Sequence, residues 1–209
     1  MRREYASAPP PRDPPIAMTS PTICEGPPLG GPKRLRINSC LTPFMSLGHP
    51  PHLGSFDYTG MHYYSLTWCC DRRQRLFTQP DRVDCVREQI LRAARKTEFE
   101  ISVDCYMPDH VHKLVRGRTA KANALKFIKL AKQCSGFHFK QTFKLRLWQR
   151  YGYDRFLRQD KDVWRIIQYI VNNPIRAGLV ERIEDYPFIG SEAYSREELN
   201  KISRMKWSG

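Results

Sequence analysis

Two histidines separated by one residue are the first feature of the chain that could do chemistry. His110 and His112 flank Val111 within residues 110–115, whose composition predicts a strand. Side chains two positions apart on a strand point to the same face, so both imidazoles could bind one metal ion. An H-x-H triplet by itself favours the alternative, a pair of surface histidines. The position of the pair, in mid-sheet directly after Met107-Pro108-Asp109 in a basic protein, favours the metal site.

A tyrosine and an asparagine farther along the chain form a second candidate group. Tyr169 and Asn173 are four residues apart, which places them one turn apart on one face of a predicted helix. Tyr169 lies at the margin of the buried stripe expected for this helix, made of Val163, Ile166, Ile167 and Ile170. Each residue alone has a structural explanation: a core tyrosine with a solvated hydroxyl, and a helix end before Pro174. Their combination with the two histidines favours a nucleophile and a third metal ligand.

Hydrophobic periodicity predicts the elements that must position these residues. Strands are expected at 62–68, 99–105, 110–115 and within 148–157. Helices are expected at 80–96, at 120–134 and from a cap at Asp160 or Asp162 to about 173, where Pro174 ends the helix. A short terminal helix is expected within residues 194–205. This order predicts an α+β fold of the ferredoxin-like βαββαβ type, with an antiparallel sheet, helices on one face and an extra C-terminal helix.

The charge of the chain favours a polyanionic partner. The 209 residues include 35 Lys and Arg against 21 Asp and Glu, a formal charge of +14. Residues 1–60 hold six of these basic and four of these acidic residues, so residues 61–209 carry 29 and 17, a net charge of +12. Such an excess suits nucleic acid or an anionic membrane surface.

Other features of the sequence favour a cytoplasmic location over a membrane or secreted one. No apolar run approaches the ~20 residues that cross a bilayer, and no apolar stretch follows Met1-Arg2-Arg3 as it would in a secretory signal. The seven cysteines include no C-x-x-C pair. Their odd number and irregular spacing disfavour a disulfide framework and a structural zinc site, and they favour a reducing cytoplasm.

The first 60 residues differ in composition from the rest. They contain twelve of the 16 prolines and six of the 12 glycines, and they show neither helical nor strand periodicity. We therefore expect a disordered tail. A regulatory or DNA-contacting arm is the alternative, because Lys33, Arg34 and Arg36 cluster there. Met61 directly precedes the first predicted strand and could be the true start of translation.

Several blocks of sequence resemble a known family. Residues 106–112 read YMPDHVH and, with Leu114-Val115, resemble the HUH motif of single-tyrosine transposases. Three further blocks resemble the REP-associated tyrosine transposase branch, which has an IS200-like domain. They read WQR at 148–150, YDR at 153–155 and YIVNNPIRAGLV at 169–180. The joint order and spacing of these blocks is far more specific than the H-x-H triplet. The resemblance covers about residues 61–191, which leaves residues 192–209 as a C-terminal extension.

The resemblance implies a role for each candidate residue. His110, His112 and Asn173 would hold a divalent cation, Mg²⁺ or Mn²⁺, that polarises a scissile phosphate in single-stranded or hairpin DNA. Tyr169 would attack the phosphorus, leaving a 5′-phosphotyrosine link and a free 3′-hydroxyl. The histidine ligands make Mn²⁺ at least as suitable as Mg²⁺. The expected protein is a cytoplasmic monomer or homodimer that binds DNA and no membrane.

Further residues are expected to bind the DNA. Contacts to its backbone are expected from Lys126, Lys129 and Lys132 on the second helix, and from Arg150, Arg155 and Arg158 near the fourth strand. Trp148 and Tyr153 could stack on unpaired bases, although a core position is favoured for Trp148. Tyr151 and Tyr153 are competing nucleophiles in principle. They rank below Tyr169 because the tyrosine of the family lies on the helix.

Lys113 departs from the family, which usually has an aliphatic residue directly after the second histidine. It shares a face of the strand with Val111 and Val115, where a buried charge is costly. Either it extends to the sheet edge or it marks an inactive copy.

Two other functions stay open for the chain. One is a DNA-binding descendant without catalysis, and the other is a ferredoxin-like metal-binding or ligand-sensing protein, which the charge disfavours.

Overall fold

The computed structural model describes residues 58–149, 153–157 and 161–205. Their strands are β1 (Tyr63–Cys69), β2 (Phe99–Met107), β3 (His110–Gly117), β4 (Tyr153–Leu157) and β5 (Ile189–Gly190). Their helices are α1 (Pro80–Lys96), α2 (Ala124–Phe143), α3 (Lys161–Val171), α4 (Asn173–Arg176) and α5 (Arg196–Ser203), with short 3-10 turns at Asp71–Arg73 and Ile183–Asp185. The prediction of a disordered tail at residues 1–60 falls almost wholly outside the described residues.

The sheet has the strand order β4-β1-β3-β2-β5, and every neighbouring pair is antiparallel. The first four strands follow the order expected for βαββαβ, which confirms the ferredoxin-like prediction. The fifth strand was not predicted, because its two residues are too few to show an alternation. It pairs with β2 at Asp104 and Cys105 and forms the edge of the sheet there.

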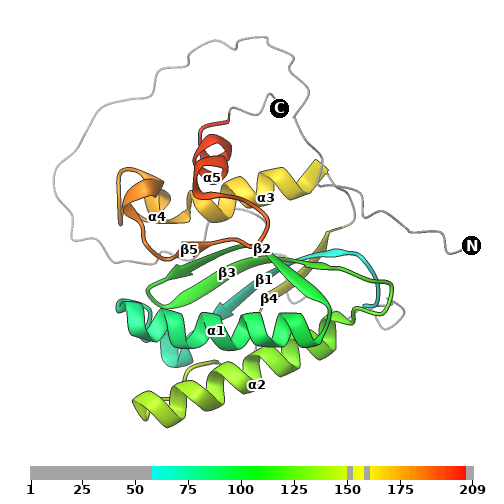
Figure 1. The fold of residues 1–209 in the computed structure, drawn as a ribbon. Helices are drawn as coiled ribbons and strands as arrows, with labels where there is room; N and C mark the ends of the chain where they lie inside the picture. Colours follow the sequence, from blue (N-terminus) through cyan, green and yellow to red (C-terminus); the bar gives the residue numbers. More distant parts are fainter. Residues whose placement is uncertain (1–57, 150–152, 158–160, 206–209) are drawn as a thin grey trace, which may run out of the picture. The chain divides into compact units, whose positions relative to one another are not determined.

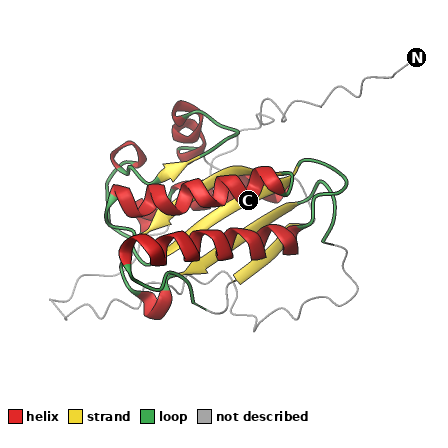
Figure 2. Ribbon diagram, turned by 60° about the horizontal axis from the view of Figure 1, so that its bottom comes forward, coloured by secondary structure: helices red, strands yellow, loops and turns green. Residues whose placement is uncertain are grey.

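Both faces of the sheet are covered by helices (Figure 1). Figure 2 shows α1 and α2 side by side across one face. They enclose a core that includes Tyr64, Leu66 and Trp68 of β1. The opposite face packs against α3 and α5, in a second core to which Cys105 and Leu114 belong. Because side chains of a strand alternate between faces, each residue of β3 belongs to one side or the other.

The second helix is longer than its sequence pattern predicted. It begins at Ala124, where the side chain of Asn123 accepts a hydrogen bond from the backbone N–H of Lys126, and it continues to Phe143 instead of ending near residue 134. Phe139 extends the buried stripe beyond that point and packs against Phe143. Lys144, with φ of 58°, ends the helix in the left-handed region.

The region around Pro174 also differs from the prediction. α3 ends at Val171, and Pro174 lies in the first turn of the separate helix α4 instead of marking a stop. A proline is tolerated there because the first turn of a helix does not use its N–H groups. Asn173 therefore belongs to α4, not to the helix that carries Tyr169. Asp162 lies inside α3, whereas the alternative cap, Asp160, lies outside the described residues.

The expected terminal helix is present as α5. Ser195 and Glu198 form a reciprocal capping box at its start. In the described part of the chain, no helix is both long and apolar enough to cross a membrane.

Candidate active site

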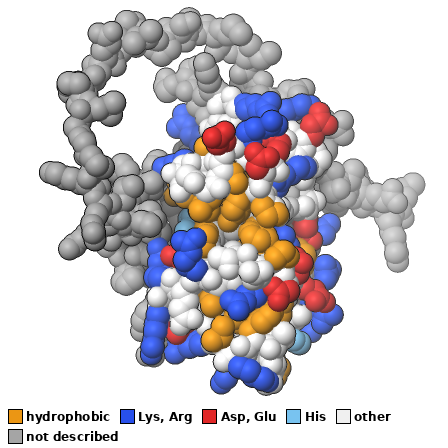
Figure 3. All heavy atoms as spheres, turned by 90° about the vertical axis from the view of Figure 1, so that its left-hand side faces the viewer, with side chains coloured by type: hydrophobic (Ala, Val, Ile, Leu, Met, Phe, Trp, Pro, Cys, Tyr) orange, Lys and Arg blue, Asp and Glu red, His pale blue; other side chains and the backbone are white. Residues whose placement is uncertain are grey.

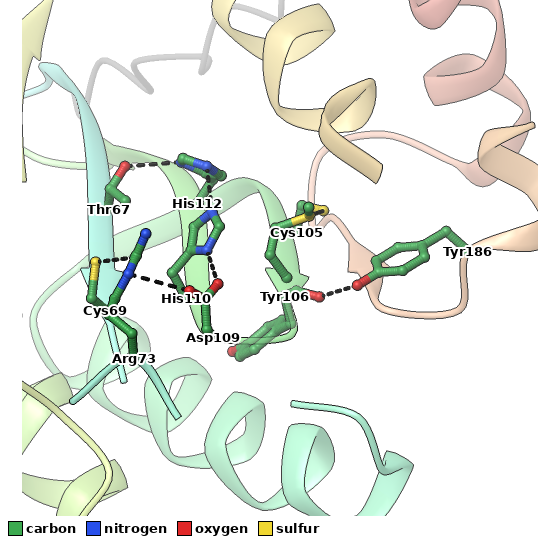
Figure 4. A network of polar contacts seen from close by, with 10 residues as sticks. Thr67, Cys69, Arg73, Cys105, Tyr106, Asp109, His110, His112 and Tyr186 are labelled. Carbon is green, nitrogen blue, oxygen red and sulfur yellow. Dashed lines mark hydrogen bonds and ion pairs between the residues drawn. The ribbon is translucent and has the colours of Figure 1, made fainter. Parts of the chain in front are cut away.

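The two histidines of β3 face each other on the side of the sheet that α3 covers. Their Nε2 atoms are 3.0 Å apart and their rings are perpendicular, with centroids 4.7 Å apart. The two residues are 5% and 9% exposed. Figure 4 shows the pair at the centre of a polar network that the neighbouring strand and the β2–β3 turn complete.

Each imidazole is oriented through its other nitrogen. His110 Nδ1 lies 2.6 Å from Asp109 Oδ1, and Asp109 is in turn paired with Arg73 at 3.2 Å. His112 Nδ1 lies 2.9 Å from Thr67 Oγ1 of the neighbouring strand. With both Nδ1 atoms engaged, the two Nε2 atoms point to one position. This is the arrangement in which outer groups orient histidine ligands of a metal.

The electrostatics around His112 favour a neutral ring. Burial and the adjacent His110 lower the pKa of His112 to about 3. Burial opposes ionisation of Asp109, but the hydrogen bond to His110 and the charges of His110 and Arg73 outweigh it and hold its pKa below the ordinary value. Neutral imidazole is the form that binds a metal, so the protonation state of His112 suits a ligand.

The distances fit a shared divalent cation. Two nitrogens 3.0 Å apart have the separation expected of neighbouring ligands about 2.1 Å from one octahedrally coordinated ion. Among the described residues, no third histidine, cysteine or carboxylate joins the pair. Asn173 forms no hydrogen bond with either histidine there; its Nδ2 donates to the carbonyl of Tyr169 at 3.0 Å. Its role as a ligand stays a prediction.

Tyr169 lies against the histidine pair. Its ring is 5.7 Å from that of His112, at an interplanar angle of 80°. The fold thus brings together a strand and a helix that are far apart in the sequence. Tyr169 is half-buried beside the fully buried Ile170, which confirms its place at the margin of the stripe. The guanidinium of Arg176, from α4, stands over the same ring at 4.8 Å.

The helix that carries Tyr169 is fixed by α5. Gln168 Nε2 donates to the carbonyls of Ile202 and Met205, at 3.1 and 2.5 Å. Asn172 Nδ2 donates to the carbonyl of Ser203, whose hydroxyl donates back to Asn172 Oδ1. The residues on both sides of Tyr169 are therefore held by hydrogen bonds, which limits sliding or rotation of α3 over the histidines.

Lys113 points away from this site. It is fully buried on the α1 and α2 side of the sheet, and its Nζ lies 4.0 Å from the ring centroid of Trp68. Burial is the main reason that its pKa falls to about 7, although Asp104 opposes the shift. The expectation that Lys113 extends to the sheet edge is therefore wrong. Its side chain does not enter the histidine site, because consecutive residues of β3 face opposite sides.

The three lysines expected to bind DNA lie on α2, away from the histidine pair. Lys126 and Lys129 are exposed on α2, which covers the face of the sheet opposite the histidines. Lys132 is half-buried, because its Nζ donates to the carbonyl of Gln149 at 3.3 Å. On the face shown in Figure 3, Lys and Arg side chains are spread around a band of exposed hydrophobic ones, so charge alone outlines no groove there.

The remaining candidates lie on or near β4. The backbone of Arg155 pairs with Ser65, and that of Tyr153 pairs with Thr67. Arg150, Arg158 and Tyr151 lie outside the described residues. Trp148 is 7% exposed and its Nε1 donates to Ser135 Oγ at 2.9 Å, so the core position favoured for it is confirmed.

Sequence reasoning missed several residues of this site. Asp109 stood in the YMPDHVH block, where a carboxylate directly before a histidine was a usable signal. Thr67 carried no such signal, because only the register of β1 against β3 places it opposite His112. The approach of Arg176 to Tyr169 depends on the short helix α4, which the pattern did not predict.

Comparisons with known proteins relate the chain to one family. The family described as "Transposase IS200 like" matches residues 59–173. A putative REP-associated tyrosine transposase of Haemophilus influenzae is 27% identical over 167 residues, which cover 73% of this chain and 91% of the relative. A REP-associated tyrosine transposase of Escherichia coli is 27% identical over 154 residues, covering 72% and 86%. A solved REP-associated tyrosine transposase bound to a REP hairpin has the same fold, with a TM-score of 0.58 at 23% identity over 73% of this chain and 88% of the other.

Proposed function

The chain belongs to the IS200-like transposase family, and on that basis we propose that it is a metal-dependent endonuclease and strand transferase for single-stranded DNA. Cleavage proceeds through a 5′-phosphotyrosine intermediate on Tyr169. The observation that supports this most strongly is the placement of the Tyr169 ring 5.7 Å from that of His112. A nucleophile beside two convergent imidazoles is the geometry that such a reaction needs.

Each residue of the site has a part in this proposal. His110 and His112, with Asn173 as the proposed third ligand, hold a divalent cation, Mn²⁺ or Mg²⁺, which supplies Lewis-acid polarisation of the scissile phosphate. Asp109 and Thr67 keep the two rings in position through hydrogen bonds to Nδ1. The depressed pKa of His112 keeps its ring neutral and available as a ligand over the whole physiological range.

The chemical step takes place at the hydroxyl of Tyr169. Its oxygen forms a bond to phosphorus as it loses its proton, and the bond from phosphorus to the 3′-oxygen breaks. The departing 3′-oxygen takes up a proton and becomes a free hydroxyl. Because the ester preserves the energy of the phosphodiester, a 3′-hydroxyl can later attack the phosphotyrosine and rejoin the strand.

Hairpin DNA is the proposed substrate. One solved relative is a REP-associated tyrosine transposase bound to a REP hairpin. The net charge of +12 on residues 61–209 supports a polyanionic partner, whose binding should weaken steeply as salt rises.

A DNA-binding descendant without catalysis is the second candidate, and the unusual Lys113 is the observation that favours it. Incubation with Mn²⁺ and a labelled pool of hairpin oligonucleotides with randomised unpaired flanks separates the two. We expect a protein–DNA adduct that survives denaturing electrophoresis. Binding of the pool by wild-type protein without any adduct would support the non-catalytic candidate instead.

A further inference from the structure

Arg176 places a positive charge at the proposed nucleophile. Its guanidinium carbon stands 4.8 Å from the centroid of the Tyr169 ring. The side chain is exposed to solvent, and within the described ranges no carboxylate forms an ion pair with it. A cation that no carboxylate of the described residues neutralises can bind an anion brought by a ligand.

The backbone around Arg176 is fixed. Its N–H donates to the carbonyl of Asn172 at 3.0 Å, and α4 closes with Gly178 at a φ of +66° and a hydrogen bond from Leu179 N–H to the carbonyl of Pro174. Asn172 is itself bonded to Ser203 of α5. The side chain of Arg176 therefore projects from a short helix whose backbone is held by hydrogen bonds.

The position of the guanidinium over the ring suits recognition of a phosphate. A guanidinium that lies over an aromatic ring uses its face for that contact and keeps the N–H groups at its edge available. Those groups form a planar fork that matches two oxygens of a phosphate. An anion bound to this fork would lie close to the edge of the Tyr169 ring.

Four cations elsewhere in the fold are already engaged or lie on the other face of the sheet. Arg73 is paired with Asp109 and donates to Cys69 Sγ at 2.8 Å. Lys113 is buried on the opposite face, and Lys126 and Lys129 belong to the helix that covers that face. Arg176, by contrast, reaches the ring that bears the nucleophilic hydroxyl.

We propose that Arg176 binds the non-bridging oxygens of the phosphate that Tyr169 attacks, and holds the same phosphate once it is esterified to the tyrosine. This inference rests on the proposed function. Arg176 forms and breaks no covalent bond. It neutralises charge on the phosphate and fixes the phosphorus in line with the tyrosine oxygen, so it should act on cleavage and on rejoining alike.

The test compares Arg176→Gln, Arg176→Lys and Arg176→Ala with wild type, using the full chain, Mn²⁺ and the best-cleaved hairpin of the randomised pool. We expect Arg176→Gln to form the adduct about 100-fold more slowly, as when a charge-stabilising donor is removed, and to rejoin strands more slowly by a similar factor. Arg176→Lys should lose about 10-fold, because lysine keeps the charge but not the fork. Guanidinium ion at a non-denaturing concentration should restore part of the rate of Arg176→Ala. Arg95→Ala, on α1, is the matched control and should keep the wild-type rate.

Binding measurements separate this role from a structural one. Hairpin affinity of Arg176→Gln should change by less than about threefold, since many cations share the backbone contacts, and Mn²⁺ affinity should not change. If Arg176→Gln forms the adduct at the wild-type rate while Tyr169→Phe forms none, the inference is wrong and the proposed function stands. A slow Arg176→Gln with weakened Mn²⁺ binding and no rescue by guanidinium would also overturn the inference. Absence of an adduct in wild-type protein would overturn both.

Discussion

Replacing the buried Lys113 with methionine should make the protein more stable. The side chain is fully buried, and its Nζ has no hydrogen-bond partner in the described part of the chain. Its pKa falls from an ordinary 10.5 to about 7. That shift corresponds to a cost of up to about 5 kcal/mol in the free energy of unfolding at neutral pH. Methionine has a similar length and no charge, so Lys113→Met should recover about 1–4 kcal/mol.

The stability gained by Lys113→Met should decrease as the pH rises. The pKa of Lys113 is lower in the folded than in the unfolded state, so between pH 7 and 10.5 the unfolded chain binds more protons. Wild-type stability should therefore rise with pH across this window through Lys113, by up to about 1.4 kcal/mol per pH unit. Methionine has no such dependence. The advantage of Lys113→Met should be largest below pH 7 and should shrink by at least about 1 kcal/mol between pH 7 and pH 9.

Urea unfolding of the two proteins in chelated buffer measures this difference. Taking the difference between proteins cancels the titration of the cysteines and tyrosines that they share. Lys129→Met is the matched control, because Lys129 is exposed on α2; its effect should stay within about 0.5 kcal/mol without a pH trend. A Lys113→Met protein that is less stable than wild type by 1 kcal/mol or more, with a gap independent of pH, would show that the ammonium is well solvated or paired in the fold. Burial of Lys113 would then carry no desolvation cost.

Two further predictions concern the metal site. His110→Ala and His112→Ala should each abolish adduct formation. Binding of single-stranded DNA should stay within about threefold of wild type, because it rests mainly on Lys and Arg. Cleavage by either variant at the wild-type rate in chelated buffer would contradict the assignment of these histidines as metal ligands. Thr67→Val removes the hydroxyl 2.9 Å from His112 Nδ1 and should weaken Mn²⁺ binding about 10–100-fold in calorimetric titration. Thr67→Ser keeps the hydroxyl and should bind Mn²⁺ nearly as well as wild type. Equal Mn²⁺ affinities of the two variants would exclude an orienting role for the hydroxyl.

Much of the fold could be predicted from the sequence because the core strands and α1 have clear periodicity. α1 was predicted at its observed bounds of residues 80–96, and the βαββ order left few arrangements for the sheet. The end of α2 and the two-residue β5 were beyond prediction for physical reasons. A helix continues wherever tertiary packing stabilises it, as Phe139 does here, and a two-residue strand is defined by its partner alone.

The geometry of the candidate site was predictable for the histidine pair but not for the helical residues. The spacing of His110 and His112 on a strand placed both rings on one face, and their convergence agrees with that reasoning. The i, i+4 argument for Tyr169 and Asn173 assumed one continuous helix, whereas the chain turns between α3 and α4. The same alternation that placed the histidines together also placed Lys113 on the opposite face. What the sequence could not indicate is that aromatic rings would enclose that ammonium within the core.

The most direct test of the account is adduct formation by Tyr169→Phe. The substitution removes one oxygen and keeps the ring that packs against His112 and Arg176, so stability, Mn²⁺ binding and hairpin binding should be unchanged. Incubated with Mn²⁺ and the labelled hairpin pool, wild type and Tyr153→Phe should form a denaturant-stable adduct, and Tyr169→Phe should form none. An adduct that persists in Tyr169→Phe and disappears in Tyr153→Phe would move the nucleophile to β4 and contradict the assignment.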